Sequence, residues 1–160
     1  MNLPGLKRIL LAEDSTLDAE LTLAALEEFN LAHQVMVVRD GAEALDYLYH
    51  RGDFEHGIQP TPAVVILDVK MPRVNGLEVL RQIKSDPKLK AVPVVMLTSS
   101  REEQDLKDSY RLGVNAYVVK PVDFQKFLTS IQQLALFWTT INEPPPAPGE
   151  TDPMEGTALD

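Results

Sequence analysis

Cysteine is absent from this 160-residue sequence, which excludes disulfides, thiolate metal sites and cysteine nucleophiles. No apolar run approaches the roughly 18 residues that a membrane-spanning helix needs. Residues 1–8 contain no long apolar stretch after a basic start, so they lack the pattern of a signal peptide. We therefore expect a cytoplasmic protein with no membrane partner.

Basic residues are also scarce. The chain has 15 Lys and Arg against 24 Asp and Glu, and its formal net charge is −9. Nucleic-acid binding depends on clustered basic side chains, so we expect no nucleic-acid partner. Apolar residues make up 44% of the sequence, which is enough for one domain with its own core.

The composition changes near residue 143. Residues 143–160 contain five prolines and five acidic residues, and no Lys or Arg. Such a segment cannot bury enough apolar surface to fold. We predict one domain at residues 1–142 and a disordered, Pro-rich, acidic tail at residues 143–160, with no room for a second output domain.

Short, solidly apolar segments alternate with segments whose apolar residues have helical spacing. Solidly apolar strands are typical of a parallel sheet covered on both faces. The sequence therefore predicts an α/β fold, a doubly wound five-stranded parallel sheet with five helices. The predicted strands are 9–12, 35–38, 63–67, 93–97 and 116–119, and the predicted helices are 15–29, 42–48, 77–85, 100–112 and 123–136.

Two helices carry recognisable boundary signals. Ser100 and Glu103 have the spacing of a capping box, which predicts the start of the fourth helix. Gly113 is suited to end that helix, and Asp123 is suited to cap the last one.

Polar residues end four of the five predicted strands: Glu13-Asp14, Asp68, Thr98 and Lys120. The carboxyl ends of parallel strands meet at one edge of such a sheet, where ligands bind. Three crowded carboxylates repel one another, and a divalent cation removes that conflict. Since only oxygen donors are present, the pattern predicts a Mg²⁺ site.

A carboxylate, a metal ion, a lysine and a hydroxyl around one point form a site suited to phosphoryl transfer. The acceptor attacks in line while the cations neutralise charge on the phosphoryl oxygens. An aspartate can be the acceptor and form an acyl phosphate.

Together these residues resemble the receiver domain of response regulators in two-component signalling, a CheY-like domain. The resemblance covers about residues 8–137. The spacings of 30 residues from Asp68 to Thr98 and 22 from Thr98 to Lys120 also fit. The matching segments are 11–14, 67–72, Gly76, 97–98 and 119–121.

The resemblance implies a set of roles for the polar residues. Asp68 would accept a phosphoryl group from a sensor histidine kinase. Asp14 and Asp68 would bind Mg²⁺ directly, Glu13 through water, and Lys70 through its backbone carbonyl. Such a regulator signals through a changed interaction surface and is not an enzyme, and its output would be protein contact or onward phosphotransfer.

The same resemblance implies how the signal spreads. Lys120 would contact the phosphoryl group, Thr98 would move to hydrogen-bond it, and Tyr117 would swing inward as Thr98 leaves. The Lys120–Pro121 peptide would be cis, which the following proline permits.

A narrower resemblance concerns the loop at residues 50–62 and the end of the last helix. Both are similar to the small regulators that pair with bacterial phytochrome kinases. Phe137 and Trp138 would either cover the core or form an exposed apolar patch. We expect a homodimer through the fourth helix, the fifth strand and the fifth helix.

Other interpretations of these residues exist. Glu13 and Asp14 would suit the N-terminus of a helix, and Tyr117 could be a core residue. A Mg²⁺ phosphatase needs an acid two residues after its aspartyl nucleophile, where Lys70 stands. A flavin protein needs a phosphate loop where Glu13 and Asp14 stand, and an unphosphorylated adaptor would not need the full acceptor set.

Overall fold

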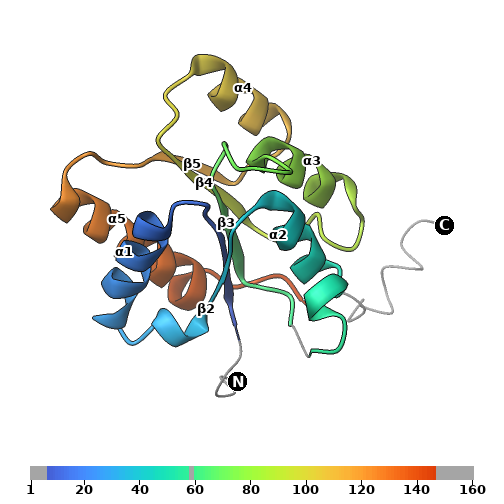
Figure 1. The fold of residues 1–160 in the computed structure, drawn as a ribbon, viewed down its shortest axis with the longest axis horizontal. Coiled ribbons are helices and arrows are strands. Elements are labelled where there is room, and N and C mark those ends of the chain that lie inside the picture. The colour runs from blue at the N-terminus through green and yellow to red at the C-terminus, as the bar shows by residue number, and fades with distance from the viewer. Residues whose placement is uncertain (1–6, 58–59, 147–160) are drawn as a thin grey trace.

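The computed structural model describes residues 7–57 and 60–146, and a five-stranded parallel sheet lies at its centre (Figure 1). The strand order is β2-β1-β3-β4-β5, so β2 and β5 are the edges. Each pair of neighbours is parallel. The strands are β1 (Ile9–Ala12), β2 (Val35–Val38), β3 (Val64–Leu67), β4 (Val94–Thr98) and β5 (Ala116–Val119).

Helices cover both faces of the sheet. Figure 1 shows α1 and α5 on one face, and α2, α3 and α4 on the other. Parallel strands need such crossover helices, because no tight turn can join them. The predicted doubly wound α/β fold is confirmed. The helices are α1 (Thr16–Glu27), α2 (Gly41–Leu48), α3 (Gly76–Ser85), α4 (Glu103–Arg111) and α5 (Phe124–Leu136).

The core has two layers because successive strand side chains point to opposite faces. Leu10 and Leu67 pack with α2 and α3 in one cluster, while Leu11 and Ile66 pack with α1 and α5 in the other. β1, β3 and β4 are fully buried, which explains their solidly apolar sequences. β5 is only partly buried, since one of its edges has no neighbouring strand.

The start of α4 differs from the prediction. The capping box at Ser100 and Glu103 is wrong, because the cap residue is Glu102 and its side chain accepts no capping hydrogen bond. The Ser100 hydroxyl instead donates to Asp105 Oδ2 (2.6 Å). The end of α4 follows the prediction: Gly113 has a φ of +101°, which glycine adopts without strain.

The two regions that set this chain apart also have structure. The segment after α2 contains a short 3₁₀ helix, Gly52–Phe54, and the Phe54 ring packs edge-on against Tyr47. α5 continues into a π-helical turn, Phe137–Ile141. Residues 147–160, most of the predicted tail, lie outside the described residues. None of the described helices has the length and apolar character to cross a membrane.

Candidate functional site

The polar residues that follow β1, β3, β4 and β5 meet at the carboxyl edge of the sheet, as the topology requires. Hydrogen bonds of the sheet continue into two of them. The Glu13 N–H donates to Val38 O (3.0 Å), and the Asp68 N–H donates to Ala12 O (3.2 Å). The pocket at this edge is lined by Glu13, Asp14, Ser15, Asp18, Asp68, Lys70, Thr98, Ser99, Ser100, Arg101, Glu102 and Lys120.

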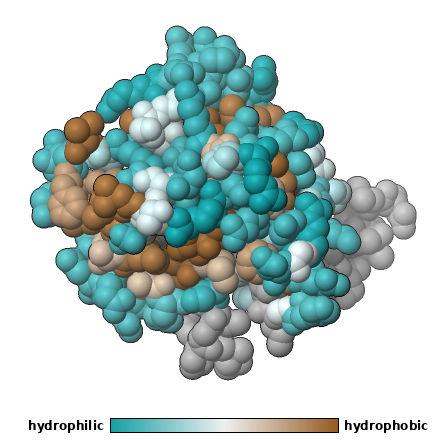
Figure 2. Space-filling model, in the orientation of Figure 1, coloured by the Kyte–Doolittle hydropathy of each residue, from teal (hydrophilic) through white to brown (hydrophobic). Residues whose placement is uncertain are grey.

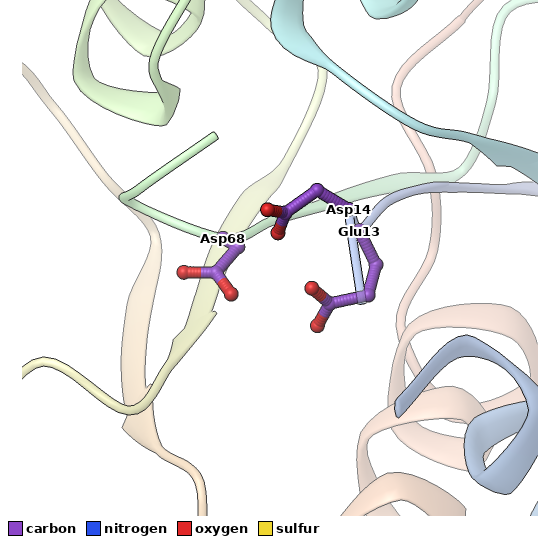
Figure 3. Close-up of side chains that lie close together, drawn as sticks. All are labelled: Glu13, Asp14 and Asp68. Carbon is purple, nitrogen blue, oxygen red and sulfur yellow. The ribbon is translucent and has the colours of Figure 1, made fainter. Parts of the chain in front are cut away.

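Three carboxylates converge in this pocket. Figure 3 shows Glu13 and Asp14, from the end of β1, and Asp68, from the end of β3, around one space. One oxygen of each lies within 4.8 Å of the others. Glu13 and Asp68 are buried, whereas Asp14 is exposed, so the group is open to solvent on one side.

These donors fit a hard divalent cation. Carboxylate oxygens are the ligands that Mg²⁺ and similar ions prefer, and the exposed side leaves room for water ligands. Burial raises the pKa of Glu13 to about 7, although its hydrogen bond to Lys120 acts in the opposite direction. A cation bound here would favour the ionised form of Glu13.

The Lys120 ammonium is the positive charge already in the pocket. It donates to Glu13 Oε1, to Asp18 Oδ2 (2.8 Å) and to Asp68 Oδ2 (3.0 Å), and its side chain is only 9% exposed. Burial acts to lower the pKa of Lys120. The hydrogen bonds to Asp18 and Glu13 and the charge of Asp68 more than offset burial, so its pKa lies above the ordinary value.

Thr98 connects the second oxygen of Asp68 to the loop before α4. Its hydroxyl donates to Asp68 Oδ1 (2.8 Å) and accepts the Ser100 N–H (3.2 Å). The carbonyl oxygen of Ser100 in turn accepts a hydrogen bond from the Tyr117 hydroxyl (3.1 Å). A continuous set of hydrogen bonds therefore runs from Asp68 to β5.

Lys70 lies across the mouth of the pocket. Its N–H donates to Asp68 Oδ1 (3.3 Å), which places its backbone beside that carboxylate. Its ammonium pairs with Glu102 Oε1 (2.9 Å), and this hydrogen bond raises the pKa of Lys70. The pair joins the loop after β3 to the start of α4.

Gly76 shapes the loop that presents Asp68. Its N–H donates to Val69 O (2.8 Å), and a Cβ at this position would lie 2.1 Å from the carbonyl oxygen of Asp68. Since real Cβ atoms essentially never come so close, the approach of α3 to Asp68 requires glycine.

Most of the predicted site residues come together here, with one correction and one addition. The described residues contain no cis peptide bond, so the predicted cis Lys120–Pro121 peptide is wrong. Trans is the lower-energy isomer even before proline, by about 0.5–1 kcal/mol. Sequence reasoning also missed Asp18, whose position in the first turn of α1 is equally typical of an acid that stabilises a helix terminus.

Comparison with known proteins gives consistent matches. A family model described as the response regulator receiver domain matches residues 9–132. The response regulator Rcp1 of Synechocystis sp. is 38% identical over 132 residues, which cover 82% of this chain and 88% of Rcp1. A structure of Rcp1 in its Mn²⁺-bound form is similar, with a TM-score of 0.80 over 88% of this chain and 99% of that chain.

Two further solved structures are similar. The phosphorylated cyanobacterial phytochrome response regulator RcpA has a TM-score of 0.81 and 37% identity, and the match covers 88% of this chain and 99% of that chain. The bacteriophytochrome response regulator RtBRR has a TM-score of 0.69 and 58% identity, with 89% of this chain and 86% of that chain covered.

Proposed function

Because this chain belongs to the response regulator receiver family, whose members accept phosphoryl groups and signal by phosphorylation, we propose that Asp68 is its phosphoryl acceptor. One observation carries the assignment. Asp68 is the carboxylate that both belongs to the three-acid group and contacts Lys120 and Thr98. Every other group in the pocket is placed around its two oxygens.

The transfer follows from the chemistry of these groups. An Asp68 oxygen forms a bond to phosphorus while the bond from phosphorus to the kinase histidine breaks, and the imidazole keeps the bonding electrons. Lys120 neutralises charge on the phosphoryl group, and Thr98 donates to it. Mg²⁺ held by Glu13, Asp14, Asp68 and the Lys70 carbonyl would neutralise the remaining charge on the phosphoryl oxygens.

Phosphorylation then changes the surface at β5. Thr98 leaves the Ser100 N–H when it turns to the phosphoryl group, which loosens the loop whose carbonyl binds the Tyr117 hydroxyl. Tyr117 moves as a result, so one covalent event biases two arrangements of the β4–α4 loop and β5. In this proposal the protein is a signalling switch and not an enzyme, and it acts in the cytoplasm.

The phosphoryl donor in this proposal is a sensor histidine kinase of the phytochrome type, as the names of RcpA and RtBRR suggest. Exposed apolar side chains beside the pocket offer a surface for it. Figure 2 shows hydrophobic surface on the side of α1 and α5. Leu17 (63% exposed), Val122 (96%) and Phe124 (51%) lie at the start of α1 and just before and within the first turn of α5.

A charge placed on this surface tests the docking proposal. Val122→Asp should slow transfer from a phosphorylated phytochrome kinase severalfold and leave labelling by a small phosphodonor unchanged. Leu106→Asp, on α4 at 40% exposure, is the matched control. Equal kinase-driven rates for the two variants would count against docking at Val122.

We also propose a homodimer through α4, β5 and α5. β5 is an edge strand, and a groove beside it is lined by Ala116 and Val118 together with Leu134, Phe137 and Trp138. The Phe137 and Trp138 rings pack edge-on at 4.9 Å, and Phe137 is 43% exposed. An apolar, partly open surface of this kind is suited to a second copy.

Sedimentation tests the dimer with and without a phosphodonor. Phe137→Gln should shift the protein toward monomer, whereas Ile141→Gln, an exposed residue on the same π-helical turn, should not. A wild-type protein that sediments as a monomer at tens of micromolar in both states removes the proposal.

Incubation with a small phosphodonor tests the acceptor itself. The wild type should gain a label that needs a divalent cation and is stable in acid but not in base. Asp68→Asn should abolish the label, and Asp53→Asn, an exposed aspartate outside the pocket, should keep it. A label that persists in Asp68→Asn would refute the acceptor assignment.

A further inference from the structure

Asp18 is a fourth carboxylate in the pocket, and none of the roles above uses it. Its backbone is fixed in the first turn of α1. The Asp18 N–H donates to the Ser15 hydroxyl (3.2 Å), and its carbonyl accepts from the Thr22 hydroxyl (2.7 Å). Its carboxylate leaves the helix and accepts a hydrogen bond from Lys120 Nζ at 2.8 Å.

The other two partners of Lys120 are Glu13 and Asp68, which also belong to the group suited to a divalent cation. A cation that takes oxygens from Glu13 and Asp68 competes with the ammonium for them. The ammonium is nearly buried, so the loss of its carboxylate partners would be costly. Asp18 is not one of the three carboxylates in that group, so it can keep its bond to Lys120 when the cation binds.

Stabilisation of the α1 terminus does not account for this geometry. In a capping box the acid at the third helical position accepts the N–H of the cap residue. Here the Ser15 N–H donates to Glu13 Oε2 (3.2 Å) instead. The Asp18 side chain is therefore free to turn toward Lys120, at 31% exposure.

We propose that Asp18 is a positioning residue for phosphoryl transfer, which holds the Lys120 ammonium beside Asp68 while a divalent cation occupies Glu13 and Asp68. This inference rests on the proposed function of Asp68. Asp18 itself touches neither the phosphoryl group nor the attacking oxygen. It acts by keeping Lys120 from moving out of reach of both.

Transfer rates give the first test. With saturating Mg²⁺ and phosphodonor, Asp18→Asn should label Asp68 about threefold to tenfold more slowly, the range expected for one partly exposed hydrogen bond between charged groups. Asp18→Glu should recover most of the rate. Glu20→Gln removes the same charge from an exposed position on α1 and is the control. A rate for Asp18→Asn equal to that of Glu20→Gln would overturn the proposal.

Thermal unfolding of the metal-free protein gives a second test that needs no phosphorylation. With Lys120 present, Asp18→Asn should lower the Tm because an ion pair is lost. In the Lys120→Met background the same change should raise the Tm, because it removes one of four mutually repelling carboxylates. A role at the helix terminus alone predicts the same fall in both backgrounds, and that result contradicts the proposal.

The two tests separate this inference from the function it rests on. If Asp68 is not labelled in the wild type, the acceptor assignment fails, while the Tm cycle still reports on the pairing of Asp18 with Lys120. If Lys120→Met does not fold, the rates of Asp18→Asn, Asp18→Glu and Glu20→Gln decide alone.

Discussion

Replacing Thr98 by valine should separate phosphoryl acceptance from signalling. Thr98 is 1% exposed, and valine matches its shape apart from the hydroxyl. The change removes the hydrogen bond to Asp68 Oδ1 and leaves the Ser100 N–H without its acceptor. Asp68 keeps its bonds to Lys120 and to the Lys70 N–H, so the acceptor itself remains in place.

The cost can be worked from these two contacts. A hydrogen bond to a charged group contributes about 1.5–3 kcal/mol, and Asp68 Oδ1 retains one donor, so about 2 kcal/mol is a fair value for the whole change. For a domain of this size each kcal/mol shifts the Tm by about 2–4 °C. Thr98→Val should therefore melt about 4–8 °C below the wild type, and Thr98→Ser, which keeps the hydroxyl, should lie close to it.

The functional readout is the environment of Tyr117. The chain has four tyrosines, so fluorotyrosine labelling gives few NMR signals, and Tyr117→Phe identifies the relevant one. In the wild type and Thr98→Ser that signal should shift on phosphorylation. In Thr98→Val the label should still form, within about threefold of the wild-type rate, which corresponds to less than about 1 kcal/mol, but the Tyr117 signal should stay. A shift that survives in Thr98→Val would show that the Thr98–Ser100–Tyr117 connection does not carry the signal.

Three further predictions follow from the same pocket. Gly76→Ala should cost about 1–3 kcal/mol in chemical denaturation and weaken cation binding, since the new Cβ would displace the Asp68 carbonyl; an unchanged denaturation midpoint contradicts this. Burial raises the pKa of Glu13 from 4.5 to about 7, so calorimetry should find Mg²⁺ affinity falling as the pH drops below about 7; in the metal-free protein the folded state binds more protons from Glu13 than the unfolded state, so this group's contribution to stability is lost as the pH rises from 4.5 to 7. Lys70→Asn breaks the exposed pair with Glu102 and should shorten the acyl-phosphate lifetime by at most about fivefold, the limit for a surface pair, and equal dephosphorylation rates would contradict a role for Lys70.

The predicted strands lie where the apolar segments placed them, because a sheet buried on both faces leaves a continuous apolar signal. β1, β2 and β5 have the predicted bounds, and the topology then brings Glu13, Asp68 and the other strand-end residues to one edge. The family identified from these residues is confirmed by the family model. The acceptor pocket was therefore accessible from residue types and chain order alone.

What the sequence did not reveal depends on side-chain direction. Asp18 in the first turn of α1 has the same signature whether it faces solvent or Lys120, and only the packing of α1 beside β5 distinguishes the two. The Ser100 hydroxyl had two local partners available, and it bonds to Asp105 and not to the predicted capping box. The isomer of the Lys120–Pro121 peptide likewise depends on local packing, because trans and cis differ by only about 0.5–1 kcal/mol before proline.

Chemical mapping of the phosphorylated residue tests the central claim most directly. Borohydride reduces an aspartyl phosphate to homoserine, so the wild type treated with phosphodonor, Mg²⁺ and then borohydride should contain homoserine at position 68 in peptide mass spectra. Omission of the divalent cation should abolish the product. Homoserine at another aspartate, or none at position 68 in a protein that carries the label, would contradict the account.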